Sequence, residues 1–110
     1  MSAHLGELEQ LVLLALLRLG PEAYGVSVRR ELQARTGRDV ALGSVYKTLE
    51  RLEDKGYVAS RLGDPTSERG GRRKRHYELR PAGQRALDDA LTALRRMLSG
   101  LEARLEPERS

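Results

Sequence analysis

The sequence predicts a mainly α-helical protein that carries one small β-hairpin. Apolar residues recur at helical spacing in four segments, and between the third and the fourth the spacing changes to that of extended strands. Glycine and proline residues separate these segments. With 110 residues, of which 39% are hydrophobic, the chain suits one globular domain with a modest core.

The first predicted helix runs from Leu8 to Leu19 and is apolar on most of its circumference, so it should be buried on several sides. Gly20 and Pro21 end it, because proline cannot continue the hydrogen-bond ladder. A second helix from about Tyr24 to Thr36 carries a narrower apolar stripe and is expected to cover the core on one side only.

Gly43 and Ser44 are predicted to open a third helix, which ends at Gly56, with the Ser44 hydroxyl capping its free amides. Its apolar stripe should face inward and consists of Val45, Leu49 and Leu52. The positions that we expect to face outward all carry hydrogen-bond donors: Ser44, Lys47, Thr48, Arg51 and Lys55.

Two strands are predicted after the third helix, over Tyr57 to Leu62 and Arg75 to Leu79, with turn-forming residues between them. They most simply form a hairpin whose buried face includes Tyr77 and Leu79, while His76 is structural or faces solvent. Three helices joined by tight glycine-containing turns are typical of a helix-turn-helix, although small helical domains of other kinds show a similar pattern. The hairpin lies where a winged helix has its wing.

The net charge of +4 is concentrated in the return limb of this hairpin. The segment from Arg69 to Arg80 contains six lysine or arginine residues and a single acidic residue, Glu78. Its local charge of +5 leaves −1 for the rest of the chain. Such a block is either a solvated tail or a contact for a polyanion, and its position inside the chain argues against a tail.

Pro81 suits the first turn of a final helix, which is predicted to continue to Leu105 with Gly100 as a weak point. Its leucines repeat at alternating steps of four and three residues: Leu87, Leu91, Leu94, Leu98, Leu101 and Leu105. Such a helix would be about 36 Å long. We therefore expect the leucine seam to bind a partner, the alternative being a helix folded back on its own domain.

In order and spacing, these segments resemble the PadR-type transcriptional regulators, especially a short subgroup with a single C-terminal dimerisation helix. The segments that carry the resemblance are Tyr24-Gly25, Gly43-Ser44-Val45-Tyr46, Lys55-Gly56-Tyr57-Val58, Gly70-Gly71-Arg72-Arg73-Lys74-Arg75-His76-Tyr77-Glu78-Leu79 and Ala82-Gly83. The resemblance implies a winged helix-turn-helix DNA-binding domain over residues 1–80 and a dimerisation helix over residues 81–110. It further implies a cytoplasmic DNA-binding regulator, expected to be a repressor, that occupies a pseudo-palindromic promoter site as a homodimer.

The expected DNA contacts come from the third helix and the wing: Ser44, Tyr46, Lys47, Thr48, Arg51, Arg72, Arg73, Lys74 and Arg75. Tyr46 has two interpretations, a phosphate contact through its hydroxyl or a plain core tyrosine. Leu8 and Leu11 of the first helix are expected to join the leucine seam at the dimer interface.

Members of the resembling subgroup can hold flat effectors between aromatic side chains at the dimer interface. This chain has no Trp or Phe, and Leu94 lies where the stacking tryptophan of some relatives falls. Any effector is therefore expected to be apolar and weakly held, in a pocket lined by Leu11, Leu94 and Leu98.

The leucine seam and the basic hairpin are also compatible with other functions. A helical adaptor could use the seam for a protein partner and the basic hairpin for RNA, and a solvated charged face would look like a DNA-reading one. An enzyme is not expected, because no nucleophile and base are suggestively spaced. Without cysteine, and with only His4 and His76, no metal or other cofactor is expected. The apolar run from Leu11 to Leu17 is too short for a membrane span, so no membrane partner is expected.

Overall fold

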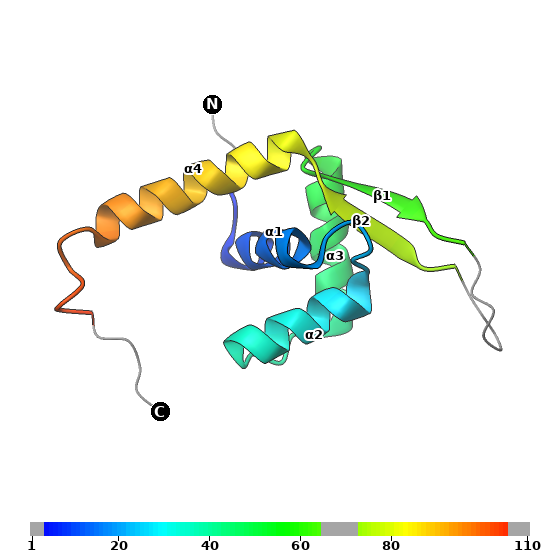
Figure 1. The fold of residues 1–110 in the computed structure, drawn as a ribbon, viewed down its shortest axis with the longest axis horizontal. Helices are drawn as coiled ribbons and strands as arrows, with labels where there is room; N and C mark the ends of the chain where they lie inside the picture. Colours follow the sequence, from blue (N-terminus) through cyan, green and yellow to red (C-terminus); the bar gives the residue numbers. More distant parts are fainter. Residues whose placement is uncertain (1–3, 65–72, 106–110) are drawn as a thin grey trace.

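The computed structural model describes residues 4–64 and 73–105, and in these ranges it confirms the predicted fold class (Figure 1). Four helices and one two-stranded antiparallel hairpin make up the described structure. Three of the helices correspond to the predicted helix-turn-helix region: α1 (Glu7–Leu19), α2 (Gly25–Thr36) and α3 (Leu42–Asp54).

Helix α1 lies at the centre of the molecule and contacts α2, α3, α4 and the strand β2 (Figure 1). Its buried positions include Leu13 and Ala15, which are two residues apart and therefore point to nearly opposite sides of the helix. The prediction that this helix is buried on several sides is therefore confirmed.

One apolar core joins all the elements. Its largest fully buried side chains are Val12, Leu13, Val28, Val45, Leu49, Leu52, Val58 and Leu87. The three predicted inward positions of α3 are all among them. Because Leu87 comes from α4, the first half of that helix belongs to the same core as α1 to α3.

The start of α3 differs from the prediction. The helix begins at Leu42, and the residue at its N-cap is Ala41, whose side chain makes no capping bond. The carbonyl of Ala41 accepts hydrogen bonds from the amides of Ser44 and Val45, at 3.0 and 3.2 Å. The Ser44 amide is thus already part of the helical ladder, so the predicted role of Ser44 as the cap is wrong.

The hairpin consists of β1 (Val58–Leu62) and β2 (Arg75–Leu79), within one residue of the predicted strands. In its register Val58 pairs with Leu79 and Leu62 pairs with Arg75. Tyr77 is buried and Leu79 is half-buried against the core, so both lie on the buried face as predicted.

The base of the hairpin is fixed to the segment between α1 and α2. The Tyr77 amide donates to the Ala23 carbonyl at 2.9 Å, and Tyr24 forms a β-bridge with His76. The His76 Nδ1 atom lies 2.8 Å from the Glu22 carbonyl oxygen, which can only accept, so Nδ1 carries the proton. His76 is therefore structural, one of the two roles predicted for it.

Helix α4 (Pro81–Leu98) begins at the predicted proline but ends seven residues before the predicted end. Gly100 has a φ of 87°, a left-handed backbone conformation that glycine adopts without strain and that cannot continue an α-helix. The chain instead forms a separate turn over residues 101–105, in which the Leu105 amide donates to the Leu101 carbonyl. The prediction of one helix reaching Leu105 is wrong, and the break falls at the predicted weak point.

Candidate nucleic-acid interface

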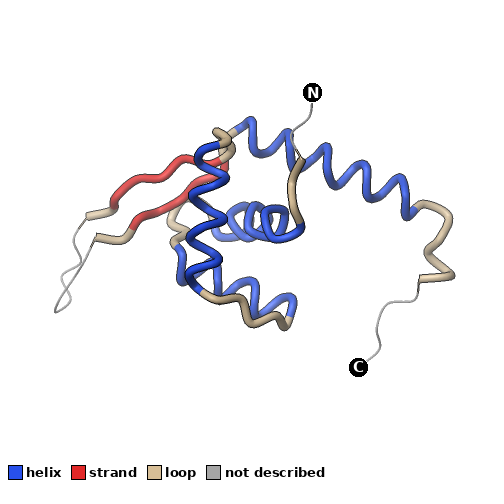
Figure 2. Tube along the Cα trace, turned by 180° about the vertical axis from the view of Figure 1, so that it is seen from behind, coloured by secondary structure: helices blue, strands red, loops and turns tan. Residues whose placement is uncertain are grey.

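The outward face of α3 is cationic only in its first half. With the apolar stripe buried, a helix of about 100° per residue directs Lys47, Glu50 and Asp54 away from the core. Ser44 and Arg51 are also exposed but lie on the flank of this face. The N-terminal half of α3 is therefore the part best suited to approach a phosphate backbone. Figure 2 shows α3 in front of α1, with the hairpin extending to one side.

Thr48 does not belong to this face, contrary to the sequence-based expectation. It is only 3% exposed, and its hydroxyl donates a hydrogen bond of 2.8 Å to the Ser44 carbonyl one turn earlier. A threonine can bury its methyl group while its hydroxyl is satisfied by the helix itself. Thr48, which was predicted to be exposed, is therefore a core residue.

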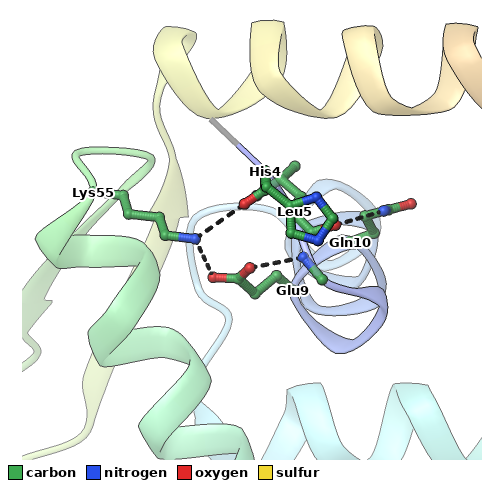
Figure 3. Close-up of polar contacts among 6 residues, drawn as sticks. His4, Leu5, Glu9, Gln10 and Lys55 are labelled. Atoms are coloured by element: carbon green, nitrogen blue, oxygen red, sulfur yellow. Dashed lines mark hydrogen bonds and ion pairs between the residues drawn. The ribbon is translucent and has the colours of Figure 1, made fainter. Parts of the chain in front are cut away.

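Lys55 is the second departure from the expected outward face (Figure 3). Its Nζ atom lies 2.7 Å from Oε2 of Glu9 in α1 and 3.3 Å from the His4 carbonyl oxygen. The side chain of Glu9 is 7% exposed and that of Lys55 is 30% exposed, so this is a partly buried ion pair. The Lys55 ammonium group is therefore directed to α1, although the residue as a whole remains exposed.

The pKa of Glu9 reflects competing influences. Burial acts to raise the pKa of the carboxyl group, but the hydrogen bonds from Lys55 and from the Gly6 amide, together with the charges of Lys55 and Arg51, lower the pKa below its ordinary value. Glu9 is thus a carboxylate at neutral pH.

Tyr46 packs against the start of α2. A Cβ atom placed on Gly25 would lie 2.4 Å from Cζ and 2.6 Å from Oη of the Tyr46 ring. Because real side chains do not approach so closely, glycine at position 25 is what allows the ring to lie there. This contact explains the Tyr24-Gly25 pair in the sequence and corresponds to the core interpretation of Tyr46.

The return limb of the wing carries three consecutive exposed basic side chains: Arg73, Lys74 and Arg75. Lys74 Nζ lies 4.4 Å from the centre of the Tyr24 ring, a cation–π contact that ties it to the helix-turn-helix. Arg75 Nη1 donates to the Ser60 hydroxyl on β1 at 3.1 Å. Arg72, predicted as a DNA contact, lies outside the described residues.

The residues expected at a dimer interface are in three different environments. Leu87 is buried in its own chain, and Leu8, Leu11 and Leu91 are half-buried against the core. Leu94 and Leu98 are 53% and 42% exposed on α4, whereas Leu101 and Leu105 are exposed beyond the end of this helix. Sequence reasoning missed Met97, which is 77% exposed; its spacing of three residues from Leu94 was a usable signal.

The three residues of the predicted effector pocket do not line one cavity in the described chain. Leu11 lines a cavity of about 130 Å³ between α1 and α2, together with Leu14 and Leu32. Leu94 and Leu98 lie on the half of α4 that extends away from the body of the molecule (Figure 1).

Within residues 4–64 and 73–105, no group of three or more histidine, aspartate or glutamate side chains is arranged to hold a metal ion. None of the described helices combines the length and the hydrophobicity that a membrane crossing requires.

An exposed, partly cationic third helix beside a basic hairpin defines a winged helix-turn-helix of the DNA-binding class. Residues 13–89 match the sequence profile of the Transcriptional regulator PadR-like family, and the chain belongs to this family. It is accordingly a DNA-binding transcriptional regulator and not an enzyme.

Solved structures share this fold. A PadR family transcription regulator from Clostridium difficile is 22% identical, with a TM-score of 0.73 over 87% of this chain and 95% of that chain. A PadR family regulator from Eggerthella lenta is 27% identical, with a TM-score of 0.67 over 93% and 88% of the two chains. Bacillus subtilis PadR, solved in complex with operator DNA, is 22% identical, with a TM-score of 0.66 over 94% of this chain and 52% of that chain. No curated protein matches this sequence.

Proposed function

We propose that this regulator is a homodimeric repressor that occupies a pseudo-palindromic promoter site. The observation that carries the proposal is the combination of an exposed cation on α3, Lys47, with the basic strand of the wing. Occupancy of promoter DNA by such a surface blocks access of the transcription machinery. The expected cytoplasmic location is part of the same proposal.

The exposed apolar half of α4 supports the dimer. Leu94, Met97 and Leu98 leave a large hydrophobic surface in the described chain, and large exposed patches of this kind mark interaction sites. Burying each side chain against a second copy would contribute roughly 1.5–3 kcal/mol before the cost of ordering. A two-fold symmetric dimer would present two α3 helices to two half-sites.

We assign different roles to α3 and to the wing. Lys47, Arg51 and Ser44 of α3 would contact base edges and phosphates in a major groove. Tyr46, whose ring and hydroxyl pack against Gly25, is assigned no DNA contact. Arg72, Arg73, Lys74 and Arg75 of the wing would neutralise phosphates or enter a minor groove. Thr48 takes no part in this scheme, because its hydroxyl is used within α3.

Control by a small molecule would act at the dimer interface. A gap between two predominantly aliphatic surfaces at the dimer centre, near Leu94, would take an apolar effector. Without an aromatic platform, planar cationic dyes lose a cation–π contribution of about 0.5–2 kcal/mol per contact. Titration of such dyes is expected to give weak binding, and submicromolar binding abolished by Leu94→Ala would contradict this expectation.

The proposal is tested by selecting DNA from a random duplex pool with the purified protein and then transcribing a promoter that contains the selected site. We expect a site with two-fold symmetry and reduced transcription on addition of the protein. Sedimentation should give a dimer at micromolar concentration. Selection of a site without symmetry would contradict the dimer, and increased transcription would contradict the repressor role.

A further inference from the structure

The partly buried ion pair between α1 and α3 is not used by any DNA contact proposed above. Oε2 of Glu9 accepts from Lys55 at 2.7 Å, while Oε1 accepts from the Gly6 amide at 2.9 Å (Figure 3). The Lys55 side chain is 30% exposed and the Glu9 side chain only 7%. Both carboxylate oxygens are thus satisfied, as a buried charge requires.

The pair is not explained by stability alone. Removing two charges from water is costly, and apolar residues of similar volume often replace a buried pair without loss of stability. What an ion pair adds to an apolar contact is a defined geometry between the two elements that it joins. Here these elements are the first turn of α1 and the C-terminal end of α3, where Lys55 is the C-cap residue.

The same lysine also holds the segment that precedes α1. Lys55 Nζ donates to the His4 carbonyl, and the next residue, Leu5, is buried with its carbonyl bonded to Gln10 Nε2. Leu5 in turn lines a cavity of about 290 Å³ against Ala86 and Ala90 of α4. The end of the DNA-reading helix is therefore connected, through Lys55 and residues 4–5, to the helix that we propose for dimerisation.

We propose that Glu9 is a positioning residue for DNA recognition, which fixes the C-terminal end of α3 and holds Lys55 away from DNA. This inference rests on the proposed reading of DNA by α3. Without the carboxylate, the C-terminal end of α3 loses its polar attachment to the first turn of α1. Lys55, one turn after Arg51 on the same flank, becomes a mobile cation that can bind any phosphate.

This proposal predicts two separate changes in the Glu9→Gln variant. Affinity for the selected site should fall about tenfold, equivalent to about 1.4 kcal/mol. Affinity for random DNA should not fall, and the slope of log affinity against log salt should become steeper by about 0.9, the value for one additional phosphate contact. A purely structural role would lower both affinities together and would leave this slope unchanged.

The matched control is Asp88→Asn on α4. It makes the same change in net charge at an exposed carboxylate that contacts only Gln84 among the described side chains, at 3.3 Å. We expect it to leave the ratio of specific to random affinity and the slope unchanged. Far-ultraviolet circular dichroism at the temperature of the binding assay establishes that each variant is folded.

The reciprocal variant Lys55→Met decides the question independently of how well Glu9→Gln folds. If Glu9 withholds Lys55 from DNA, Lys55→Met should leave the salt slope of the unmutated protein unchanged. A slope flatter by about 0.9 would mean that Lys55 is itself a phosphate contact, and it would overturn the proposal. Unchanged specific affinity in Glu9→Gln would also overturn it, whereas failure of the unmutated protein to select any DNA would refute the proposed function instead.

Discussion

Replacing Gly83 by alanine provides a strict test of how α4 is attached to the wing. Gly83 lies in the first turn of α4 and is buried. A Cβ atom at this position would lie 2.3 Å from the Tyr57 carbonyl oxygen and 2.9 Å from Leu79 Cδ1. The Tyr57 carbonyl also accepts a hydrogen bond of 2.9 Å from the Arg80 amide, so it cannot move without affecting that bond.

Two opposing effects determine the sign of the change. Alanine is favoured over glycine in a helix by about 1 kcal/mol. The clash with a backbone oxygen must be relieved by moving α4 away from residue 57, and overpacking of this kind costs typically about 1–3 kcal/mol. We expect Gly83→Ala to lower the free energy of unfolding by about 1–2 kcal/mol, since the neighbouring atom is backbone and not the end of a flexible side chain.

Urea unfolding followed by circular dichroism measures this change, and Gly43→Ala is the control. Gly43 is also helical, but a Cβ atom there would have no neighbour within 4 Å. That variant should gain up to about 1 kcal/mol from helix propensity alone. If Gly83→Ala proves as stable as the unmutated protein or more so, the close packing of α4 on residue 57 is not as described.

Three further predictions concern the dimer, the DNA contacts and the ion pair between Glu9 and Lys55. Leu94→Asp combined with Leu98→Asp should convert the proposed dimer to a monomer in sedimentation, and a persistent dimer would place the interface elsewhere. Arg51→Ala should weaken binding to the selected site more than to random DNA, whereas Arg73→Ala should weaken both and flatten the salt dependence; equal losses from Arg51→Ala on every sequence would contradict base reading by α3. The pKa of Glu9 is lowered in the folded protein, so its contribution to stability is complete above the ordinary value of 4.5 and is lost as the pH falls through the lower, folded-state pKa. As the pH falls through this acidic range, the free energy of unfolding should therefore decline more steeply for the unmutated protein than for Glu9→Gln. Parallel curves for the two proteins would contradict the assignment.

Patterns of local sequence predicted most of the fold. The apolar spacing identified the buried positions Val45, Leu49 and Leu52 of α3, and Pro81 marked the start of α4 because its ring suits the first turn of a helix. Alternation of Tyr77 and Leu79 with polar residues predicted the buried face of the wing. Each of these signals depends on residues close together in the chain.

The errors arose where the deciding contact is distant in sequence, or where two local arrangements are equally plausible. Lys55 was expected to face outward because its carboxylate partner, Glu9, is 46 residues away. Thr48 has a donor suited to DNA, yet the same hydroxyl can bond to its own helix, and periodicity alone does not choose between the two. The leucine repeat favoured a continuous helix past Gly100, whereas the backbone there turns left-handed.

The anchoring of the wing to the segment between α1 and α2 has a consequence for the kinetics and the geometry of binding. Main-chain bonds through Ala23 and Tyr24 hold the two strands in place before any ligand arrives. Association with DNA then requires little additional ordering of the strands, which reduces the entropic cost of forming the complex. The distance between α3, which we propose reads a major groove, and the strands, which we propose contact phosphates, is also set in advance. A site lengthened by one base pair between these two regions should lose affinity, because the protein cannot adjust its own spacing to follow the DNA.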